Sequence, residues 1–101
     1  MTDRIEQSKA LASETRMRIL DWLKQPSRCF SHQETGDPDE IGVCVTLIAD
    51  KLNMSQPTVS RHLDILRRAG FVEVERIGRW SFFSRNPKGI EAYGKWLNDN
   101  L

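Results

Sequence analysis

Residues 46–70 read TLIADKLNMSQPTVSRHLDILRRAG, and this stretch decides the fold that we predict. Its apolar spacing indicates two short helices joined by a tight turn, with Thr46 as a cap for the first. Ser55 is a favourable N-cap for the second helix, and Pro57 falls in its first turn, where a missing N–H costs nothing. Gly70 follows where a left-handed residue is favoured. The second helix carries one apolar stripe: Val59, Leu63 and Leu66.

Near the start of the second helix, its other face carries side chains that are small, hydrogen-bonding or basic. Such a face, following a tight turn, suits the major groove of DNA. The candidate DNA-binding residues of this helix are Ser55, Gln56, Thr58, Ser60, Arg61 and His62. His62 lies beside the apolar stripe, so a packing or phosphate-contacting role is expected rather than metal ligation.

A β-hairpin is predicted directly after Gly70. After Phe71, apolar and charged residues alternate over 72–75 and Arg76 follows; a glycine-containing turn comes next at 77–79, and an aromatic-rich run begins at Trp80. The hairpin carries Arg76, Arg79 and Arg85, which makes it a candidate wing over the phosphates. The alternative is a solvated hairpin that only packs its aromatic residues on the core.

The N-terminal half predicts two helices and then an irregular segment. A first helix around Ile5 precedes a second from Glu14 to about Lys24, capped by Ser13. Residues 25–41 show no periodicity, and a loop of that length is generally functional or disordered. A short strand is expected at 43–45.

The terminal segment 88–101 predicts an amphipathic helix with more apolar surface than a small domain needs. We expect it to pair with the N-terminal helix and with the same helices of a second chain, giving a two-fold dimer. The alternative is that both helices pack only on their own domain. The candidate interface residues are Ile5, Ile90, Tyr93, Trp96 and Leu97.

Length and composition predict one domain over residues 1–101, mainly α with a small β-hairpin. Neither a signal pattern nor a membrane span is found, so a cytoplasmic location without membrane contact is expected. The net charge is only +1, yet residues 54–88 hold seven basic and three acidic side chains, net +4. Residues 29–53 hold one and five, net −4. The basic excess thus falls on the presumed DNA-binding part.

Three motifs resemble the ArsR/SmtB family of bacterial winged helix-turn-helix repressors. LASETRMRIL (11–20) is similar to the family's L-A-D-P-T-R-L-R-I-L, and residues 52–70 match L-x-x-S-Q-x-x-V-S-x-H-L-x-x-L-x-x-A-G. RIGRWSFF (76–83) is similar to the wing pattern R-x-G-R-x-x-x-Y. The resemblance spans about Lys9 to Leu97. It implies a homodimer that binds double-stranded operator DNA and leaves it when an inducer binds.

The sequence departs from the metal sites that the resemblance implies. One family site uses C-V-C, where this chain reads Cys44-Val45-Thr46 and lacks the second thiolate. Another uses histidine and carboxylates on the last helix, which here contains Glu91 and Asp99 but no histidine. No cofactor is therefore assigned, although a metal ion stays possible.

Cys29, His32 and Cys44 are the candidate sensor residues, and three interpretations of them stay open, beside an organic ligand bound elsewhere in the protein. The cysteines are structural, with Cys44 a small apolar residue in a buried strand. The thiols form a redox or sulfur switch. A metal or metalloid binds both cysteines, His32 and an acid of the 25–43 loop.

The function predicted from the sequence is a dimeric, sequence-specific transcriptional regulator. A repressor released by a thiol redox change or by a metal fits best. The alternative is a winged-helix module for protein contacts. No nucleophile, base and acid occur in a recognisable set, so an enzyme is not expected.

Overall fold

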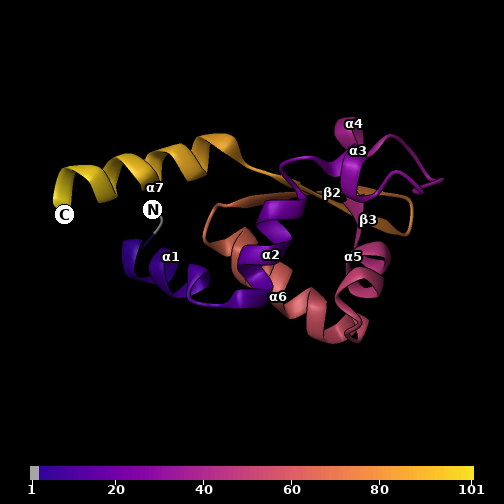
Figure 1. Ribbon diagram of the computed structural model, residues 1–101, viewed down its shortest axis with the longest axis horizontal. Helices are drawn as coiled ribbons and strands as arrows, with labels where there is room; N and C mark the ends of the chain where they lie inside the picture. The colour runs from indigo at the N-terminus through magenta and orange to yellow at the C-terminus, as the bar shows by residue number, and fades with distance from the viewer. Residues whose placement is uncertain (1–2) are drawn as a thin grey trace.

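The computed structural model describes residues 3–101, and Figure 1 shows helices gathered around a small sheet. The first part of the chain forms α1 (Arg4–Leu11), α2 (Glu14–Trp22), α3 (Pro26–Cys29), α4 (Pro38–Ile41) and β1 (Val43–Cys44). The second part forms α5 (Val45–Leu52), α6 (Gln56–Arg68), β2 (Val72–Ile77), β3 (Trp80–Arg85) and α7 (Pro87–Asn100). This is the predicted fold class, with a helix-turn-helix at α5–α6 and a hairpin at β2–β3.

The three strands form one antiparallel sheet in the order β1-β3-β2. The hairpin pairs Val72 with Arg85 at its base and Ile77 with Trp80 at its tip, leaving a two-residue turn. The first turn residue, Gly78, has a φ of 62°, which favours glycine. The hairpin tip therefore projects from the domain at a defined place.

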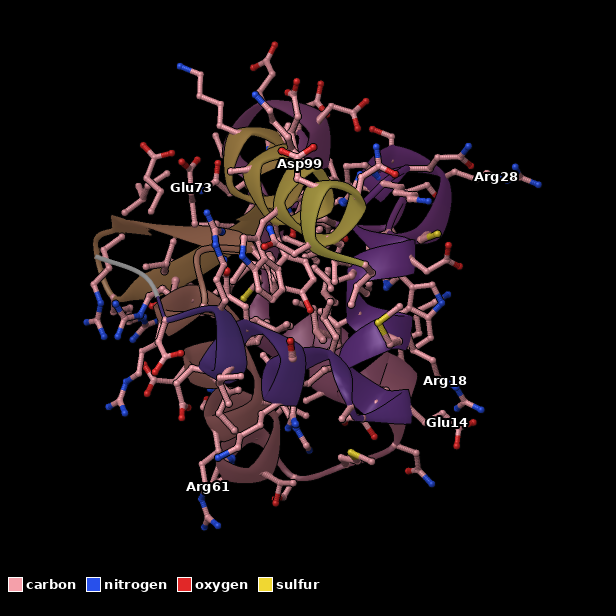
Figure 2. All side chains as sticks on the ribbon, turned by 90° about the vertical axis from the view of Figure 1, so that its left-hand side faces the viewer. Glu14, Arg18, Arg28, Arg61, Glu73 and Asp99 are labelled. Atoms are coloured by element: carbon pink, nitrogen blue, oxygen red, sulfur yellow. The ribbon has the colours of Figure 1, made fainter. Side chains whose placement is uncertain are left out.

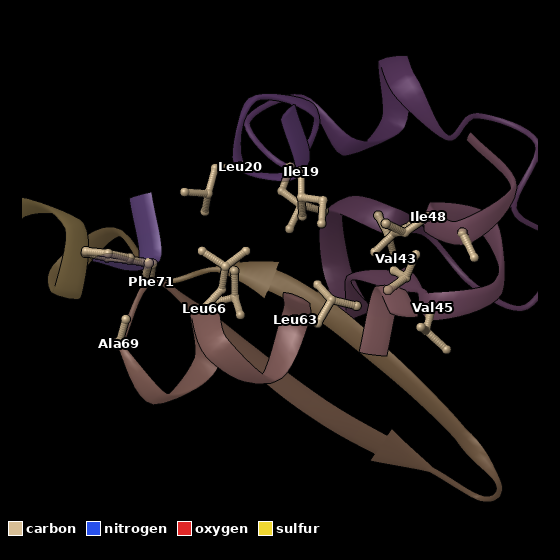
Figure 3. Close-up of a cluster of buried hydrophobic side chains, with 14 of the residues drawn as sticks. Ile19, Leu20, Val43, Val45, Ile48, Leu63, Leu66, Ala69 and Phe71 are labelled. Atoms are coloured by element: carbon tan, nitrogen blue, oxygen red, sulfur yellow. The ribbon is translucent and has the colours of Figure 1, made fainter. Parts of the chain in front are cut away.

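The core lies where α2, α5 and α6 meet the sheet (Figure 3). Ile19, Ile48 and Leu63 have no exposed surface. Burial of each such side chain stabilises the fold by roughly 1.5–3 kcal/mol. The predicted stripe of Val59, Leu63 and Leu66 is fully buried, which orients the opposite face of α6 towards solvent.

Local capping explains where the helix-turn-helix begins and ends. The Ser55 hydroxyl accepts a hydrogen bond from the amide of Thr58, as expected for an N-cap. Asn53 ends α5 with a left-handed φ of 54°, and Gly70 follows α6 with a φ of 82°. The prediction that Thr46 caps the first helix is wrong, and so is the prediction that the strand extends to Val45. Pairing stops after Cys44, and the helix starts at Val45 with no side-chain cap.

The segment between α2 and β1 is more ordered than its composition predicts. Its anchor is Gln33, whose amide nitrogen donates to the carbonyl of Gly42 at 3.0 Å and whose amide oxygen accepts from the Cys44 amide at 2.9 Å. Phe30 is fully buried. Gly42 adopts a φ of 93°, and a Cβ there would lie 2.7 Å from the carbonyl oxygen of Phe83. The segment is thus fastened to the edge of the sheet, and α3 and α4 form within it.

Helices α1 and α7 lie at one end of the molecule, where both termini are found (Figure 1). The Gln7 amide donates to the carbonyl of Ala69 at 2.9 Å, and the hydroxyls of Ser8 and Tyr93 are 2.7 Å apart. These contacts tie α1 to the end of α6 and to α7. Within residues 3–101, no helix is long and apolar enough to cross a membrane.

Candidate nucleic-acid interface

The exposed face of α6 presents the predicted polar residues. Gln56, Thr58, Ser60 and Arg61 are all exposed, and Figure 2 shows Arg61 pointing away from the body of the protein. Ser55 differs, because its hydroxyl is occupied by the helix cap and by a 2.9 Å hydrogen bond to the Thr58 hydroxyl. The first two turns of α6 therefore offer free side chains at Gln56, Ser60 and Arg61.

The hairpin places two of its three arginines near the tip. Arg76 and Arg79 are exposed, and the Arg79 guanidinium lies 5.4 Å from the centre of the Trp80 ring. Arg85 is different, because it pairs with Val72 at the base of the hairpin and is half-buried. Arg85 is therefore not part of the wing. Strand register decides this, because the base of the hairpin packs near α2 and α7.

A groove of about 780 Å³ runs between α6 and the hairpin and joins Gln56 and Ser60 to the hairpin arginines, whereas Ser55, Thr58 and Arg61 lie outside its lining. It is lined by Gln56, Ser60, Asp64 and Arg67 from α6, by Arg76, Arg79, Trp80 and neighbours from the hairpin, and by Thr46 from α5. Three arginines and one aspartate give this groove a net charge of +2. A groove of this sign attracts the phosphate backbone.

Asp64 is neutralised within α6. Arg67 donates to one carboxylate oxygen at 2.7 Å, and Arg68 lies 3.0 Å from the other. The hydrogen bond from Arg67, together with the charges of Arg68 and Arg67, lowers the pKa of Asp64. Asp64 is therefore ionised at neutral pH and holds both arginines against the helix.

Arg67, Thr46 and Trp80 also line the groove, although none of them was among the predicted DNA-binding residues. For Arg67 a signal existed, since positions 56, 60, 64 and 67 follow helical spacing and form one stripe along α6. Thr46 and Trp80 gave no such signal, because α5 and the hairpin reach the groove only through tertiary packing.

His62 is half-buried and contacts α2 rather than lining the groove. Its Nδ1 atom lies 3.0 Å from a guanidinium nitrogen of Arg16, which also donates to the carbonyl of Ala10 at 2.6 Å. Because arginine can only donate, Nδ1 accepts and the ring proton lies on Nε2. Burial and the charge of Arg16 lower the pKa of His62. His62 thus fits the packing role, linking α6 to α2.

The three candidate sensor residues are not gathered into one site. Cys44 is buried and its sulfur lies 3.1 Å from the Thr46 hydroxyl, while Cys29 is half-buried and also free. His32 lines a hollow of about 300 Å³ together with Cys44, but Cys29 does not. Among the described residues, no three histidine, cysteine or acidic side chains come close enough to hold a metal ion. The set Cys29, His32 and Cys44 is therefore not a metal site in this structure.

The candidate dimer residues fall into two groups. Ile5 is 60% exposed, and Trp96 and Leu97 are half-buried on α7. Tyr93 is only 6% exposed, because it packs edge-on against Phe71 at 5.4 Å within the same chain. Ile90 is half-buried like Trp96 and Leu97, and all three pack in part against the core of their own chain. Tyr93 is therefore an internal residue, contrary to expectation, since the end of α6 places Phe71 opposite it.

Comparison with known proteins gives consistent matches. The family model for bacterial regulatory proteins of the arsR family matches residues 43–74, from β1 to the first residues of β2. The uncharacterized HTH-type transcriptional regulator YbzH of Bacillus subtilis is 44% identical over 97 residues, covering 96% of this chain and 97% of that protein. The transcriptional repressor SdpR of Bacillus subtilis is 30% identical, covering 88% and 82%.

A solved structure matches the fold along almost the whole chain. It is the homodimeric winged helix-turn-helix DNA-binding domain Mb0332 of Mycobacterium bovis, described as a possible ArsR-family regulator. The TM-score is 0.64 at 24% identity, covering 94% of this chain and 77% of that one. At that identity the likeness concerns the fold alone.

Proposed function

This chain belongs to the arsR family of bacterial regulatory proteins, and we propose that it acts as a homodimer that grips operator DNA in the groove between α6 and the hairpin. As a member of this family it is a DNA-binding transcriptional regulator and not an enzyme. The observation that carries the proposal is the groove itself. It joins the exposed polar stripe of α6 to the arginines of the hairpin, with a net positive charge.

The exposed face of α6 and the hairpin have different roles, and Arg61 belongs to that face of α6 although it lies outside the lining of the groove. Gln56 and Arg61 lie near the start of α6. Glutamine forms bidentate hydrogen bonds with adenine, and arginine forms them with guanine. The smaller Ser60 contacts a base edge or the adjoining phosphate, whereas Ser55 and Thr58, whose hydroxyls bond to each other, fix the start of α6 and offer only their remaining hydrogen-bonding capacity to DNA. On the hairpin, Arg76 and Arg79 hold phosphates, which fixes the position of α6 without reading sequence.

The dimer is proposed to form through α1 and the outer part of α7. Ile5 is exposed there, and Trp96 and Leu97 keep part of their surface open. The SdpR and Mb0332 proteins are described as a repressor and as a homodimer, respectively. A two-fold dimer would present two α6 helices to half-sites about one helical turn, roughly 34 Å, apart.

The experiment that tests the function is a titration of the purified chain against labelled DNA, read by fluorescence anisotropy. The DNA from upstream of its own gene is compared with a shuffled duplex of equal length and composition. We expect tighter binding to the upstream DNA, with an affinity that falls steeply as salt rises. Equal affinity for both duplexes would contradict a sequence-specific regulator and favour the protein-contact module.

For Cys44 the contacts support a structural role rather than a sensing one. Its thiol is buried and meets the Thr46 hydroxyl, and its backbone amide is held by Gln33. We therefore expect reduced and oxidised protein to bind operator DNA equally. Release on oxidation that Cys44→Ser prevents would reverse this assignment and make the thiol the inducer site.

A further inference from the structure

A second cavity lies away from the DNA-facing groove, between α2 and the start of α7. Its volume is about 210 Å³. The apolar part of its wall includes Leu20 of α2, Phe71 before β2, and Ile90 and Tyr93 of α7. Figure 3 shows Leu20 and Phe71 on their separate elements. The cavity thus lies where three segments distant in sequence converge.

Three charged side chains complete the wall: Lys24, Arg85 and Asp21. Arg85 is half-buried, and its Nε atom is buried with no hydrogen-bond partner. No ion pair to Arg85 occurs within residues 3–101, although Asp21 lines the same cavity. A buried donor without a partner costs free energy, and a charged donor costs more than a neutral one. Arg85 is therefore a cation in the cavity wall whose Nε atom lacks a partner, and a ligand reaches that atom only when the side chain turns towards the cavity.

We propose that this cavity binds a small monocarboxylate whose apolar body is about the size of one ring. Lys24 and Asp21 are exposed to solvent, and together with Arg85 they leave a net charge of +1, which matches one negative charge. An apolar cavity of about 150 Å³ holds benzene, so 210 Å³ accepts a single ring with its carboxylate. The ring lies among Leu20, Phe71 and Tyr93, and the carboxylate meets the forked guanidinium of Arg85 after a small side-chain rotation.

The cavity touches the end of the presumed DNA-reading helix through Phe71. The Phe71 amide donates to the carbonyl of Leu66 in α6 at 3.0 Å, and its carbonyl accepts from the Asn86 amide at 2.9 Å. On the other side, Tyr93 packs against Phe71 and bonds to Ser8 of α1. A ligand pressing on Phe71 therefore acts on α6, α1 and α7 together. The effect on DNA rests on the proposed function, whereas binding of the ligand does not.

The test is calorimetric titration of the full chain with two acids, phenylacetate and benzoate, and with their neutral amides, phenylacetamide and benzamide. Each amide keeps the shape of its acid but lacks the negative charge. We expect saturable binding of at least one acid with a Kd at or below about 1 mM, and about tenfold weaker binding of its amide. No saturable binding of either acid up to about 10 mM, or equal binding of acid and amide, would overturn the proposal.

Two substitutions in the cavity wall test where the ligand binds, and a third, at an exposed arginine, controls for the loss of a positive charge. Arg85→Met keeps an apolar stem but removes the guanidinium, so we expect it to abolish the preference for acid over amide. Ile90→Phe fills the cavity and should weaken acid and amide alike. Arg28→Met removes an exposed arginine on α3 and should bind as wild type does. An unchanged acid preference in Arg85→Met, with a folded spectrum, would place any binding elsewhere and contradict the proposal.

The DNA titration without any acid is run in parallel, so that the cavity proposal and the proposed function can be contradicted independently of each other. Loss of acid binding with intact operator preference would overturn only the cavity proposal. Acid binding without operator preference would overturn only the proposed function. If both hold, saturating acid is expected to change operator affinity in wild type and not in Arg85→Met.

Discussion

His62 illustrates how two neighbours set the charge of one side chain. It lies among the exposed residues of α6 in sequence, but in space it contacts Arg16 of α2. Desolvation by burial is the larger cause and the positive charge of Arg16 the smaller one, and both lower the pKa of His62. A neutral ring that accepts from Arg16 therefore joins α2 to the DNA-facing helix.

The lowered pKa of His62 predicts a stability loss in mild acid. The unfolded chain takes up a proton near pH 6.5, before the folded chain does, so the free energy of unfolding falls as pH drops below about 6.5. The contribution is fully present above that pH and is lost as the pH falls through the folded pKa. Urea titrations between about pH 7.5 and about pH 5 should show a weaker decline for His62→Gln than for wild type.

Two controls separate this effect from others. His32→Gln changes an exposed histidine and should keep the wild-type decline. The lowered pKa of Asp64 acts in a different range, because its contribution is lost only below about pH 3.8. A decline in His62→Gln as steep as in wild type would show that the Arg16 contact does not govern this pH range.

Alanine substitutions of Arg61 and of Arg79 are expected to weaken DNA binding in different ways. Arg61→Ala should cost about 1–3 kcal/mol on the preferred sequence and relax preference at one base pair, because the proposed function assigns this exposed side chain to a base edge. Arg79→Ala should weaken all duplexes alike and lower the salt slope by about one. Arg18→Ala, which removes an exposed arginine paired with Glu14, serves as the control in the same anisotropy titrations. Identical sequence profiles for Arg61→Ala and wild type would remove Arg61 from the reading surface.

At the scale of elements, α7 contains two glycines in opposite situations. At Gly89 a Cβ would overlap the carbonyl oxygen of Gly70, at the point where the Asn86 side chain also donates to that carbonyl at 2.9 Å. At Gly94 a Cβ would meet nothing within 4 Å. One glycine is therefore required by the joint between α6 and α7, and the other only weakens the helix.

Replacing each glycine by alanine should shift stability in opposite directions. Gly89→Ala should lower the free energy of unfolding by about 1–3 kcal/mol, because the backbone at position 89 must move away from the carbonyl of Gly70. Gly94→Ala should raise it by up to about 1 kcal/mol through helix propensity. Urea midpoints of the two variants measure this. Equal shifts in one direction would contradict the close approach of α7 to Gly70.

At the scale of the whole molecule, α7 extends the domain along one axis. The molecule measures 43 × 25 × 24 Å, and Figure 1 shows α7 reaching past the helices of the domain. The Arg4 guanidinium lies 5.9 Å from the centre of the Trp96 ring, so α1 and α7 stay in contact along this extension. An exposed Ile5 on α1 completes a surface suited to a second copy of the chain.

Two isoleucines provide a matched test of that surface. Ile5 is 60% exposed on α1 and Ile65 is 41% exposed on α6. Ile5→Asp should convert the dimer to monomer and weaken operator binding, because a charge cannot be buried unpaired at an interface. Ile65→Asp should stay dimeric. Sedimentation velocity measures both, and a dimeric Ile5→Asp would exclude α1 from the interface.

The sequence by itself determined the helix-turn-helix and the hairpin. Their signals are local: the cap at Ser55, the stripe of Val59, Leu63 and Leu66, and the glycine at position 78 act within a few residues. Local preferences can be recognised in one sequence because the interacting groups are neighbours in the chain. The polar face of α6 followed directly from the position of its apolar stripe.

Only the tertiary structure decided which distant residues meet. Gln33 fastens a segment that composition suggested was irregular, and Arg85 lies at a cavity rather than on the wing. Tyr93 turns inward to Phe71 and to Ser8, which is 85 residues away in sequence. Cys29 does not join Cys44 and His32 in one hollow. Such contacts depend on how whole elements pack together, and residue spacing along the chain carries no record of that packing.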